Sequence, residues 1–277
     1  MFAFFNYPGL AQTSEPCRLE LIERRPRQAA DSRPLLFIHG AYAGAWCWDE
    51  YFLPYFAERG YHALALSLRG HGGSEGGERL HSFGIADYVS DLAQVVAGLE
   101  QPPVLIGHSM GGMVVQKYLE RHQAPAAVLM ASVPPSGLGG SAMRLMSSDP
   151  MLMLDMSLLQ HGRVSPQELR SASRAVFSDD VRAEDLARYA RNFQAESHRA
   201  LWDMTVADLP KLWRINAPPM LVLGAADDAL FSTAMVEATA QSYAAELEIF
   251  PGMAHGMMLE RDWQLAADRI VTWLNSP

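Results

Sequence analysis

The most constraining feature of this chain is a regular alternation of short apolar runs with longer segments of helical spacing. Seven runs have the length and composition of buried strands: residues 18–23, 34–40, 62–68, 103–109, 126–132, 219–225 and 246–252. Amphipathic helices are indicated between them by apolar residues that recur every three or four positions: residues 48–60, 84–100, 113–122 and 262–275. This alternation predicts an α/β fold, in which helices cover both faces of a mostly parallel central sheet.

The alternation stops between residues 133 and 215. No convincing strand pattern occurs there, and the segment lies between two predicted strands. We therefore expect a core domain of residues 1–132 and 216–277, with residues 133–215 inserted as a helical cap over the carboxyl edge of the sheet. Five methionines fall between residues 143 and 156. Such stripes usually belong to an ordinary core, but flexible thioethers also suit the wall of an adaptable apolar pocket.

Composition limits the classes of partner. The chain has 277 residues, of which 49% are hydrophobic, so it can bury a large core. Its formal net charge is −9 and it has no run of Lys or Arg, which argues against nucleic acid and anionic membrane surfaces as partners. We expect a small-molecule substrate instead, bound by a monomer or a homodimer.

The cysteines and the hydropathy pattern point to a cytoplasmic protein. Cys17 and Cys47 belong to no CxxC or Cys/His cluster, so neither a zinc site nor a disulfide framework is predicted. Residues 1–12 lack the basic region and the apolar stretch of a signal peptide, and no run is long enough to span a membrane. We expect no stable membrane insertion, no metal and no organic cofactor.

The sequence GHSMG places Ser109 where an apolar run gives way to a helical segment, between Gly107 and Gly111. A tight strand–turn–helix would hold this serine at strained backbone angles and raise its hydroxyl above the carboxyl edge of the sheet. Glycines are needed on either side because side chains there would collide with the neighbouring strand and helix. A capping serine in an ordinary turn is the alternative. The strand before it and the helix after it favour a nucleophile.

A serine nucleophile needs a base, and the base needs an acid to orient it. His255 follows a predicted strand and a Pro-Gly turn, on a late loop that can reach the serine. Asp227 and Asp228 directly follow another strand, and only one of them can point at His255. Of the other histidines close to these motifs, His39 and His71 are assigned structural roles, and the side chain of His108 is expected to point elsewhere because it lies one residue from Ser109 at a sharp turn.

The oxyanion of an acyl-transfer reaction requires two N–H donors. The first N–H groups of the helix after Ser109 point into the space above its hydroxyl, which predicts Met110 as one donor. The second should come from the loop after an early strand. The sequence HGAYAGAWCW, at residues 39–48, has the small residues of such a loop and predicts the backbone N–H of Ala41.

These segments resemble the α/β-hydrolase superfamily over residues 18–275. The resemblance is carried by HGAYAGAWCW, LRGHGGS, GHSMGG, GAADD and GMAHGMMLE. It is greatest to plant methyl esterases and to the bacterial esterase and haloperoxidase-like branches. Members commonly place the acid three residues after the glycine that ends the preceding strand, which implies Asp227. Ser67 stands where many members have aspartate, and we interpret this as a structural variation.

Together the motifs predict a serine hydrolase that cleaves carboxylic esters through an acyl-enzyme. Ser109, His255 and Asp227 form the predicted triad. An apolar pocket for small to medium acyl or aromatic groups is expected near Met110, lined by Tyr42, Met143, Met146 and Trp202.

Two other readings stay open. The same triad could cleave a thioester, a lactone or a C–C bond, or carry out perhydrolysis. The chain could also be a small-molecule binding protein on a hydrolase scaffold. Similar hydroxynitrile lyases rely on a lysine in the pocket. The only lysines of this chain, Lys117 and Lys211, lie away from the motifs, so this activity is disfavoured. The similar haloalkane dehalogenases and epoxide hydrolases have an aspartate nucleophile where this chain has Ser109, which argues against both activities.

Overall fold

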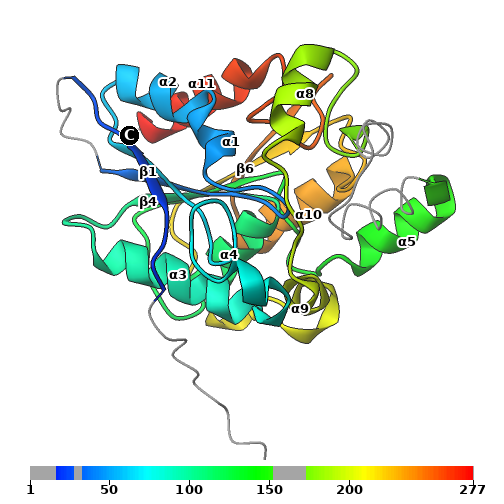
Figure 1. Cartoon of the computed structure of the whole chain (residues 1–277), viewed down its shortest axis with the longest axis horizontal. Helices are drawn as coiled ribbons and strands as arrows, with labels where there is room; N and C mark the ends of the chain where they lie inside the picture. Colours follow the sequence, from blue (N-terminus) through cyan, green and yellow to red (C-terminus); the bar gives the residue numbers. More distant parts are fainter. Residues whose placement is uncertain (1–16, 28–32, 152–172, 277) are drawn as a thin grey trace, which may run out of the picture.

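The computed structural model describes residues 17–27, 33–151 and 173–276 (Figure 1). Its centre is a seven-stranded sheet of order β1-β3-β2-β4-β5-β6-β7. Strand β1 pairs antiparallel with β3, and every other neighbouring pair is parallel. The strands are β1 (Leu21–Arg24), β2 (Leu35–Ile38), β3 (Ala63–Leu66), β4 (Val104–His108), β5 (Ala127–Met130), β6 (Met220–Ala225) and β7 (Glu246–Phe250). The prediction of a mostly parallel sheet is confirmed: six of the seven apolar runs contain a whole strand, and β1 overlaps the first run and ends one residue beyond it.

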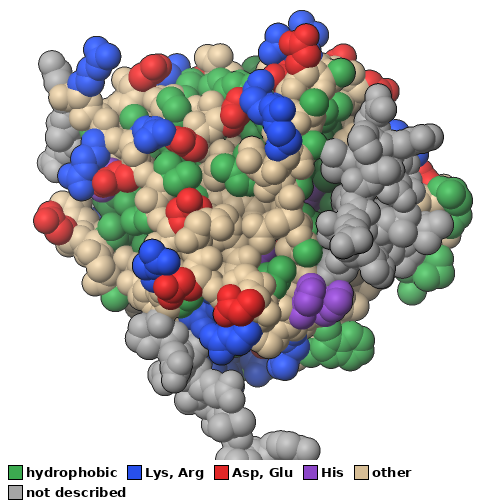
Figure 2. Space-filling model, in the orientation of Figure 1, with side chains coloured by type: hydrophobic (Ala, Val, Ile, Leu, Met, Phe, Trp, Pro, Cys, Tyr) green, Lys and Arg blue, Asp and Glu red, His purple; other side chains and the backbone are tan. Residues whose placement is uncertain are grey.

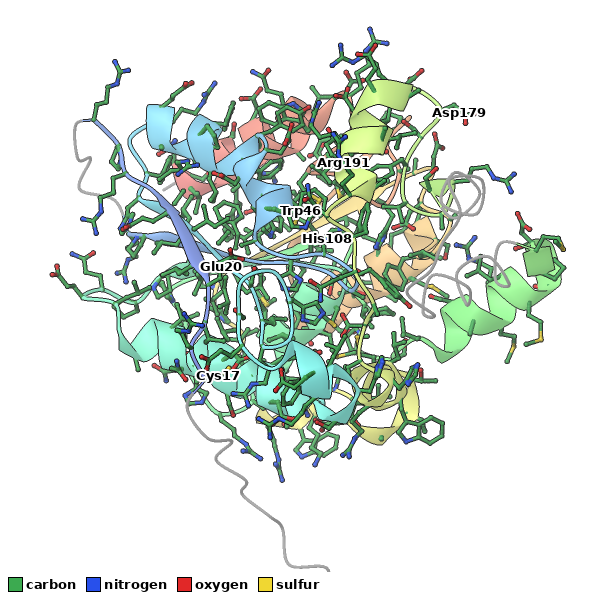
Figure 3. All side chains as sticks on the ribbon, in the orientation of Figure 1. Cys17, Glu20, Trp46, His108, Asp179 and Arg191 are labelled. Carbon is green, nitrogen blue, oxygen red and sulfur yellow. The ribbon has the colours of Figure 1, made fainter. Side chains whose placement is uncertain are left out.

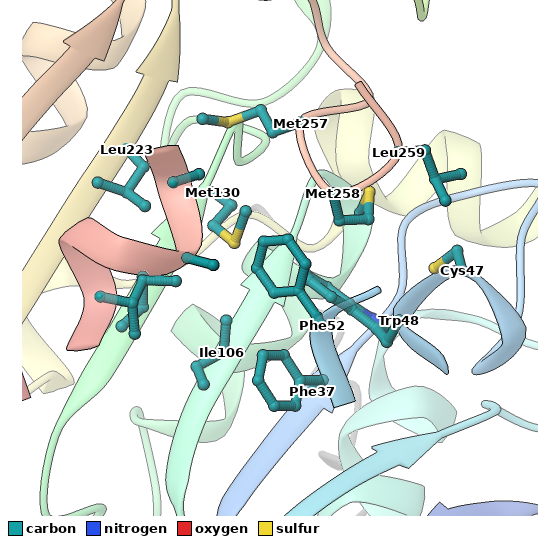
Figure 4. Packing of buried hydrophobic residues seen from close by; sticks show 14 of the residues in the cluster. Phe37, Cys47, Trp48, Phe52, Ile106, Met130, Leu223, Met257, Met258 and Leu259 are labelled. Atoms are coloured by element: carbon teal, nitrogen blue, oxygen red, sulfur yellow. The ribbon is translucent and has the colours of Figure 1, made fainter. Parts of the chain in front are cut away.

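Helices cover both faces of this sheet (Figure 1). On one face lie α1 (Trp46–Asp49), α2 (Phe52–Glu58) and α11 (Trp263–Leu274). On the other lie α3 (Ile85–Ala97), α4 (Met110–Tyr118) and α10 (Thr233–Tyr243). Figure 4 shows the first core, where aromatic residues of β2 and of the α1–α2 region pack against methionines. The α/β layering that the sequence predicts is therefore confirmed.

The helix expected over residues 48–60 is interrupted. Tyr51, between α1 and α2, has φ −136° and ψ −45°, outside the helical range. Pro54 gives the reason, because it has no N–H to donate to the carbonyl of Glu50 and its ring would collide with that carbonyl. Proline is tolerated in the first turn of a helix, so α2 begins just before it.

Residues 133–215 enter after β5 and return before β6, two strands that are neighbours in the sheet. The described part of this segment contains no strand. It contains α5 (Gly139–Ser148), α8 (Ala183–Ala190), α9 (His198–Trp202), a π-helical turn (Asp203–Ala207) and a 3₁₀ turn (Leu212–Arg214).

The inserted segment contacts loops at the carboxyl edge of the sheet. The N–H of Gln194 donates to the carbonyl of Tyr42, after β2, at 3.0 Å. The N–H of Gly256, after β7, donates to the carbonyl of Val176 at 2.6 Å. The described residues of the insertion therefore lie against the loops where the sequence places the reactive groups.

Helix α5 turns two of the predicted pocket residues outward. Met143 is 74% exposed and Met146 is 62% exposed. The inner face of the helix consists of Ser141 and Leu145, four positions apart, and Leu145 packs near Ala229 and Leu230. Because a helix buries only one face, Met143 and Met146 fall on the opposite side, and their prediction as pocket wall is wrong here. Two further methionines of the run lie outside the described residues: Met153 and Met156.

On the face seen in Figure 2, acidic and basic side chains alternate without a large area of one sign. No helix within the described ranges has the length and apolar character needed to cross a bilayer. Cys17 and Cys47 are free thiols, and Cys47 is buried in the core of Figure 4.

Candidate active site

Ser109 occupies a strained turn between β4 and α4. Its backbone has φ 51° and ψ −116°, a positive φ that costs an L-residue roughly 1–2 kcal/mol. Its N–H donates to the carbonyl of Met130 on β5, which anchors the turn. The side chain makes no capping hydrogen bond to α4. A capping role therefore does not explain this serine, and the strained turn that the motif predicts is present.

The flanking glycines are required by close packing. A Cβ on Gly107 would lie 2.5 Å from the carbonyl oxygen of Gly111 in α4. A Cβ on Gly111 would collide with the carbonyl oxygens of Ile38 and His39, at the end of β2. Both predicted close approaches, to the helix and to the strand, are thus present. They allow the strand–turn–helix around Ser109, called the elbow below, to pack tightly against its neighbours.

His255 is held by Asp228. Its Nδ1 lies 2.8 Å from Oδ2 of Asp228, and both side chains are almost completely buried. A carboxylate can only accept, so Nδ1 carries the proton and Nε2 presents a lone pair. The second oxygen of Asp228 accepts the N–H groups of Leu230 and Phe231, at 2.7 and 2.9 Å. Asp228 is therefore fixed at both oxygens and sets one tautomer of His255.

The prediction of Asp227 as the acid is wrong. The chain turns at Ala226 and Asp227 after β6, and both residues are exposed. The N–H of Asp227 donates to the carbonyl of Met253, which fixes the turn with the Asp227 side chain toward solvent. Asp228 follows the turn, so its side chain points back into the protein toward His255. Asp228 therefore both accepts the N–H groups of its own turn and faces His255.

The side chain of His108 ties the backbone of His255 to the elbow at Ser109. Its Nε2 donates to the carbonyl of His255 at 2.8 Å, and the two rings lie 4.7 Å apart. Burial, together with the neighbouring His255, holds the pKa of His108 well below its usual value, so the ring is neutral. In Figure 3 it lies in the middle of the molecule. The side chain of His108 therefore has a structural contact that the sequence did not indicate, with the backbone of His255.

The loop after β2 lies directly against the serine. A Cβ on Gly40 would be 3.0 Å from Cβ of Ser109 and 2.8 Å from Nδ1 of His108. Met110 is the first residue of α4, so its N–H has no acceptor within that helix. These positions are compatible with Ala41 and Met110 as oxyanion donors, and that assignment stays a prediction.

Ser67 and Glu20 support the same loop. The hydroxyl of Ser67 accepts the N–H of Ala45 at 2.8 Å and donates to Oε2 of Glu20 at 2.6 Å. Glu20 also accepts the N–H of Gly73 at 3.0 Å. The hydroxyl of Ser67 and the carboxylate of Glu20 thus join the loop after β2 to the loop after β3.

His39 also has a structural role, as predicted. Its Nδ1 donates to the carbonyl of Gly40, and its Nε2 accepts the N–H of Leu68. Burial lowers the pKa of His39 to about 3, so the ring stays neutral. His71 behaves differently, because its Nε2 lies 3.0 Å from a carboxylate oxygen of Glu196 in the inserted segment.

Two expected pocket residues remain to be placed. Tyr42 is half-buried in the loop beside Ser109, so its position fits a pocket wall. Trp202 is 61% exposed at the end of α9, which does not fit a buried wall. Phe231, whose ring lies 5.4 Å from that of His255, was not anticipated; it follows the acid by three residues. Among the described residues, no group of three potential ligands could hold a metal ion.

Known proteins are similar to this chain in sequence and in fold. The family model described as the alpha/beta hydrolase family matches residues 35–269. The monoacylglycerol lipase of Mycolicibacterium smegmatis is 25% identical over 236 residues, 80% of this chain and 80% of that protein. The non-heme haloperoxidase of Rhodococcus erythropolis is 39% identical over 107 residues, 37% of this chain and 38% of that protein.

The similarity to haloperoxidases is partial. A non-heme chloroperoxidase of Streptomyces lividans is 34% identical over 131 residues, 46% of this chain and 45% of that protein. The chain thus aligns with less than half the length of either relative of this type. An esterase from Exiguobacterium antarcticum superposes with a TM-score of 0.74 at 19% identity, covering 94% of this chain and 96% of that one, and shares its fold. Because the family model spans most of the sequence and the fold agrees, the chain belongs to the α/β-hydrolase family.

Proposed function

We propose that this protein is a serine hydrolase that cleaves carboxylic esters through an acyl-enzyme. The observation that carries the proposal is the buried hydrogen bond from Nδ1 of His255 to Asp228, which leaves Nε2 as a base. Ser109, the proposed nucleophile, is held at positive φ in the turn that follows β4. His108, the residue directly before Ser109, supports the proposal further, because its side chain donates to the carbonyl of His255.

In the first half-reaction the hydroxyl oxygen of Ser109 attacks the ester carbonyl while Nε2 of His255 takes its proton. The tetrahedral intermediate collapses, the C–O bond to the alcohol breaks, and His255 returns the proton to the leaving oxygen. In the second half-reaction His255 deprotonates a water molecule that attacks the acyl carbonyl. The bond to the Ser109 oxygen then breaks, the carboxylic acid leaves, and His255 returns the proton to Ser109. Asp228 stabilises the imidazolium in both halves.

The oxyanion is stabilised by the N–H groups of Ala41 and Met110 in this proposal. Gly40 packs against Cβ of Ser109, and the N–H of Met110 has no acceptor in its own helix, so both loops lie where such donors are needed. One donor of this kind contributes about 3–4 kcal/mol to the stability of the transition state.

Residues 133–215 act as a cap in this proposal, and the substrate is a small-molecule ester with a small to medium acyl or aromatic group. Tyr42 and Phe231 provide apolar surface for this group in the proposal. Tyr42 belongs to the loop next to Ser109, and the ring of Phe231 lies 5.4 Å from that of His255.

Hydrolysis of p-nitrophenyl esters from acetate to decanoate tests the proposal. We expect turnover by the wild type and a loss of at least about 1,000-fold in Ser109→Ala, because removing the nucleophile leaves only binding and the oxyanion donors. Thermal melting of both proteins controls for folding. A wild type that is inert on every ester would contradict ester hydrolysis.

A second candidate, perhydrolysis, is favoured by the haloperoxidase relatives. Hydrogen peroxide would replace water in the second half-reaction: its oxygen attacks the acyl carbonyl and His255 takes its proton. A peracid then leaves as the bond to Ser109 breaks, and His255 returns the proton to the Ser109 oxygen. Peracid formation from an acyl ester and hydrogen peroxide, measured by bromide oxidation, tests this. Wild-type and Ser109→Ala rates that are equal would contradict it.

A further inference from the structure

The backbone of Tyr42 is held on both sides by the inserted segment. Tyr42 has φ 66°, a left-handed conformation that is unfavourable for a bulky side chain. Its carbonyl accepts the N–H of Gln194 at 3.0 Å, and its N–H donates to Oε2 of Glu196 at 3.4 Å. The strained turn that contains Ala41 and Tyr42 is therefore fixed by residues about 150 positions further along the chain.

The side chain of Gln194 extends this contact to the loop after β3. Its Oε1 accepts the N–H of Gly72 at 2.9 Å, and its Nε2 donates to the carbonyl of Gly70 at 2.8 Å. The segment Gln194–Glu196 thus contacts the two loops that lie beside the elbow.

Glu196 is completely buried, and its neighbours are donors. Oε2 accepts from Nε2 of His71 at 3.0 Å as well as from Tyr42. Oε1 accepts from the hydroxyl of Tyr88 at 2.9 Å and from the N–H of Ser197 at 2.6 Å. Both oxygens must accept at once, and only a carboxylate can do so.

His71 supplies the compensating charge. Its Nδ1 lies 3.1 Å from the carbonyl of Arg69, and its Nε2 faces Glu196, so both ring nitrogens meet acceptors. Two acceptors require two protons, which makes the ring an imidazolium. An ion pair with no exposed side-chain surface joins the inserted segment to the core. Breaking such a pair costs far more than forming it gains, so its geometry is well defined.

We propose that Glu196 is a positioning residue for the oxyanion loop: its carboxylate, neutralised by His71, holds Tyr42 in the left-handed conformation that aims the N–H of Ala41 at the oxyanion above Ser109. The inference rests on the proposed function and deepens it. It makes the inserted segment a structural determinant of the oxyanion site, beyond any part that it plays in substrate binding.

Glu196→Gln discriminates between positioning and simple packing. A carboxamide has nearly the same volume but offers one acceptor oxygen, so its NH₂ must face two of the donors. A neutral His71 can accept from that NH₂, whereas the N–H of Tyr42 cannot. The substitution should therefore release Tyr42 selectively.

Glu120→Gln is the matched control. Glu120 pairs with Lys117 at 2.7 Å and accepts the N–H of Lys211, so it also joins the inserted segment to the core through a shielded carboxylate. It lies beyond the far end of α4 from Ser109. Tyr88→Phe is a milder second variant, which removes one donor to Glu196 and leaves the charge.

Steady-state kinetics on p-nitrophenyl acetate and backbone hydrogen exchange of residues 39–46 are measured for all four proteins. In Glu196→Gln we expect kcat to fall about 10- to 100-fold with KM changed less than threefold, since oxyanion donors act on the transition state. Exchange of residues 39–46 should accelerate at least tenfold. Tyr88→Phe should change both in the same direction by less, and Glu120→Gln should change neither.

The proposal is overturned if Glu196→Gln keeps kcat within twofold and exchange within the wild-type range, or if Glu120→Gln produces equal losses. If Glu196→Gln does not fold, Tyr88→Phe decides by the same two readouts. A wild type without ester turnover contradicts the proposed function alone, because hydrogen exchange still tests the hold of Glu196 on the loop.

Discussion

Oδ2 of Asp228 accepts the Nδ1 proton of His255 at 2.8 Å, while its other oxygen accepts two backbone N–H groups of the loop that follows. The residue thus orients the histidine and is itself oriented by its own turn. Asp227, its neighbour in sequence, faces solvent. This difference between adjacent aspartates allows a direct test.

Asp228→Asn should lower kcat by about 10³- to 10⁴-fold, because an amide that faces Nδ1 favours the wrong tautomer of His255. Asp227→Asn is the matched control and should stay within about twofold of wild type, as exposed substitutions usually do. Ester hydrolysis by the two variants, with melting curves, provides the measurement. Equal losses in both would contradict the assignment of Asp228.

His108→Phe should lower kcat about tenfold with little change in KM, because the carbonyl of His255 loses its donor and the ring of His255 shifts relative to Ser109. An unsatisfied buried carbonyl should also cost about 1–3 kcal/mol of stability. His108→Gln keeps an N–H donor and should retain more activity. Comparison of kcat between the two variants checks this, and a Phe variant as active as the Gln variant would refute it.

Gly111→Ala should destabilise the protein by about 2–4 kcal/mol, since its Cβ would overlap backbone carbonyls of Ile38 and His39 that cannot rotate away. Gly77→Ala is the control, because a Cβ there meets nothing within 4 Å. Urea unfolding of both variants measures the difference. Similar unfolding midpoints would show that the elbow can relax around a methyl group.

The pair of His71 and Glu196 makes stability depend on pH. Burial alone would lower the pKa of His71, but Glu196 outweighs it and raises the pKa above 6.5; burial would raise the pKa of Glu196, but His71 and the donors lower it below 4.5. Within the described part of the chain, the other titratable groups that face the pair are His39, which stays neutral, and the phenols of Tyr88 and Tyr42. Burial and Glu196 raise the pKa of both phenols, so they stay protonated.

The His71 contribution is complete below pH 6.5 and is lost as pH rises through its raised pKa. The Glu196 contribution is complete above pH 4.5 and is lost as pH falls through its lowered pKa. Melting temperatures of wild type and His71→Gln should therefore differ most between pH 4.5 and 6.5 and converge on the alkaline side. A difference that grows toward high pH would contradict a charged His71.

The strands and the strained turn at Ser109 were predictable because their signals are local. A parallel strand buried on both faces reads as a short apolar run, and Ser109 lies between glycines that steric collisions require. The acid was placed one residue too early, because the side to which each aspartate points depends on a turn fixed by a bond from Asp227 to Met253. That contact leaves no trace in the sequence around either residue.

Other parts of the site could not be read from the chain. The methionine run does not show which side of α5 faces the protein, and Met143 and Met146 proved exposed. The pairing of His71 with Glu196 joins residues 125 positions apart. His71 lies in the LRGHGGS motif, but nothing in the sequence around it points to Glu196 as its partner. Burial and partner, rather than residue type, give these side chains their roles.

The insertion between β5 and β6 also sets an order for synthesis on the ribosome. Ser109 emerges before the insertion, whereas Asp228 and His255 emerge after it, and β5 has to wait for Met220 before it can pair with β6. A nascent chain that has reached the end of the insertion therefore contains Ser109 but neither Asp228 nor His255. Such late, long-range pairing is slow, so the three residues of the proposed site come together only when the last strands join the sheet.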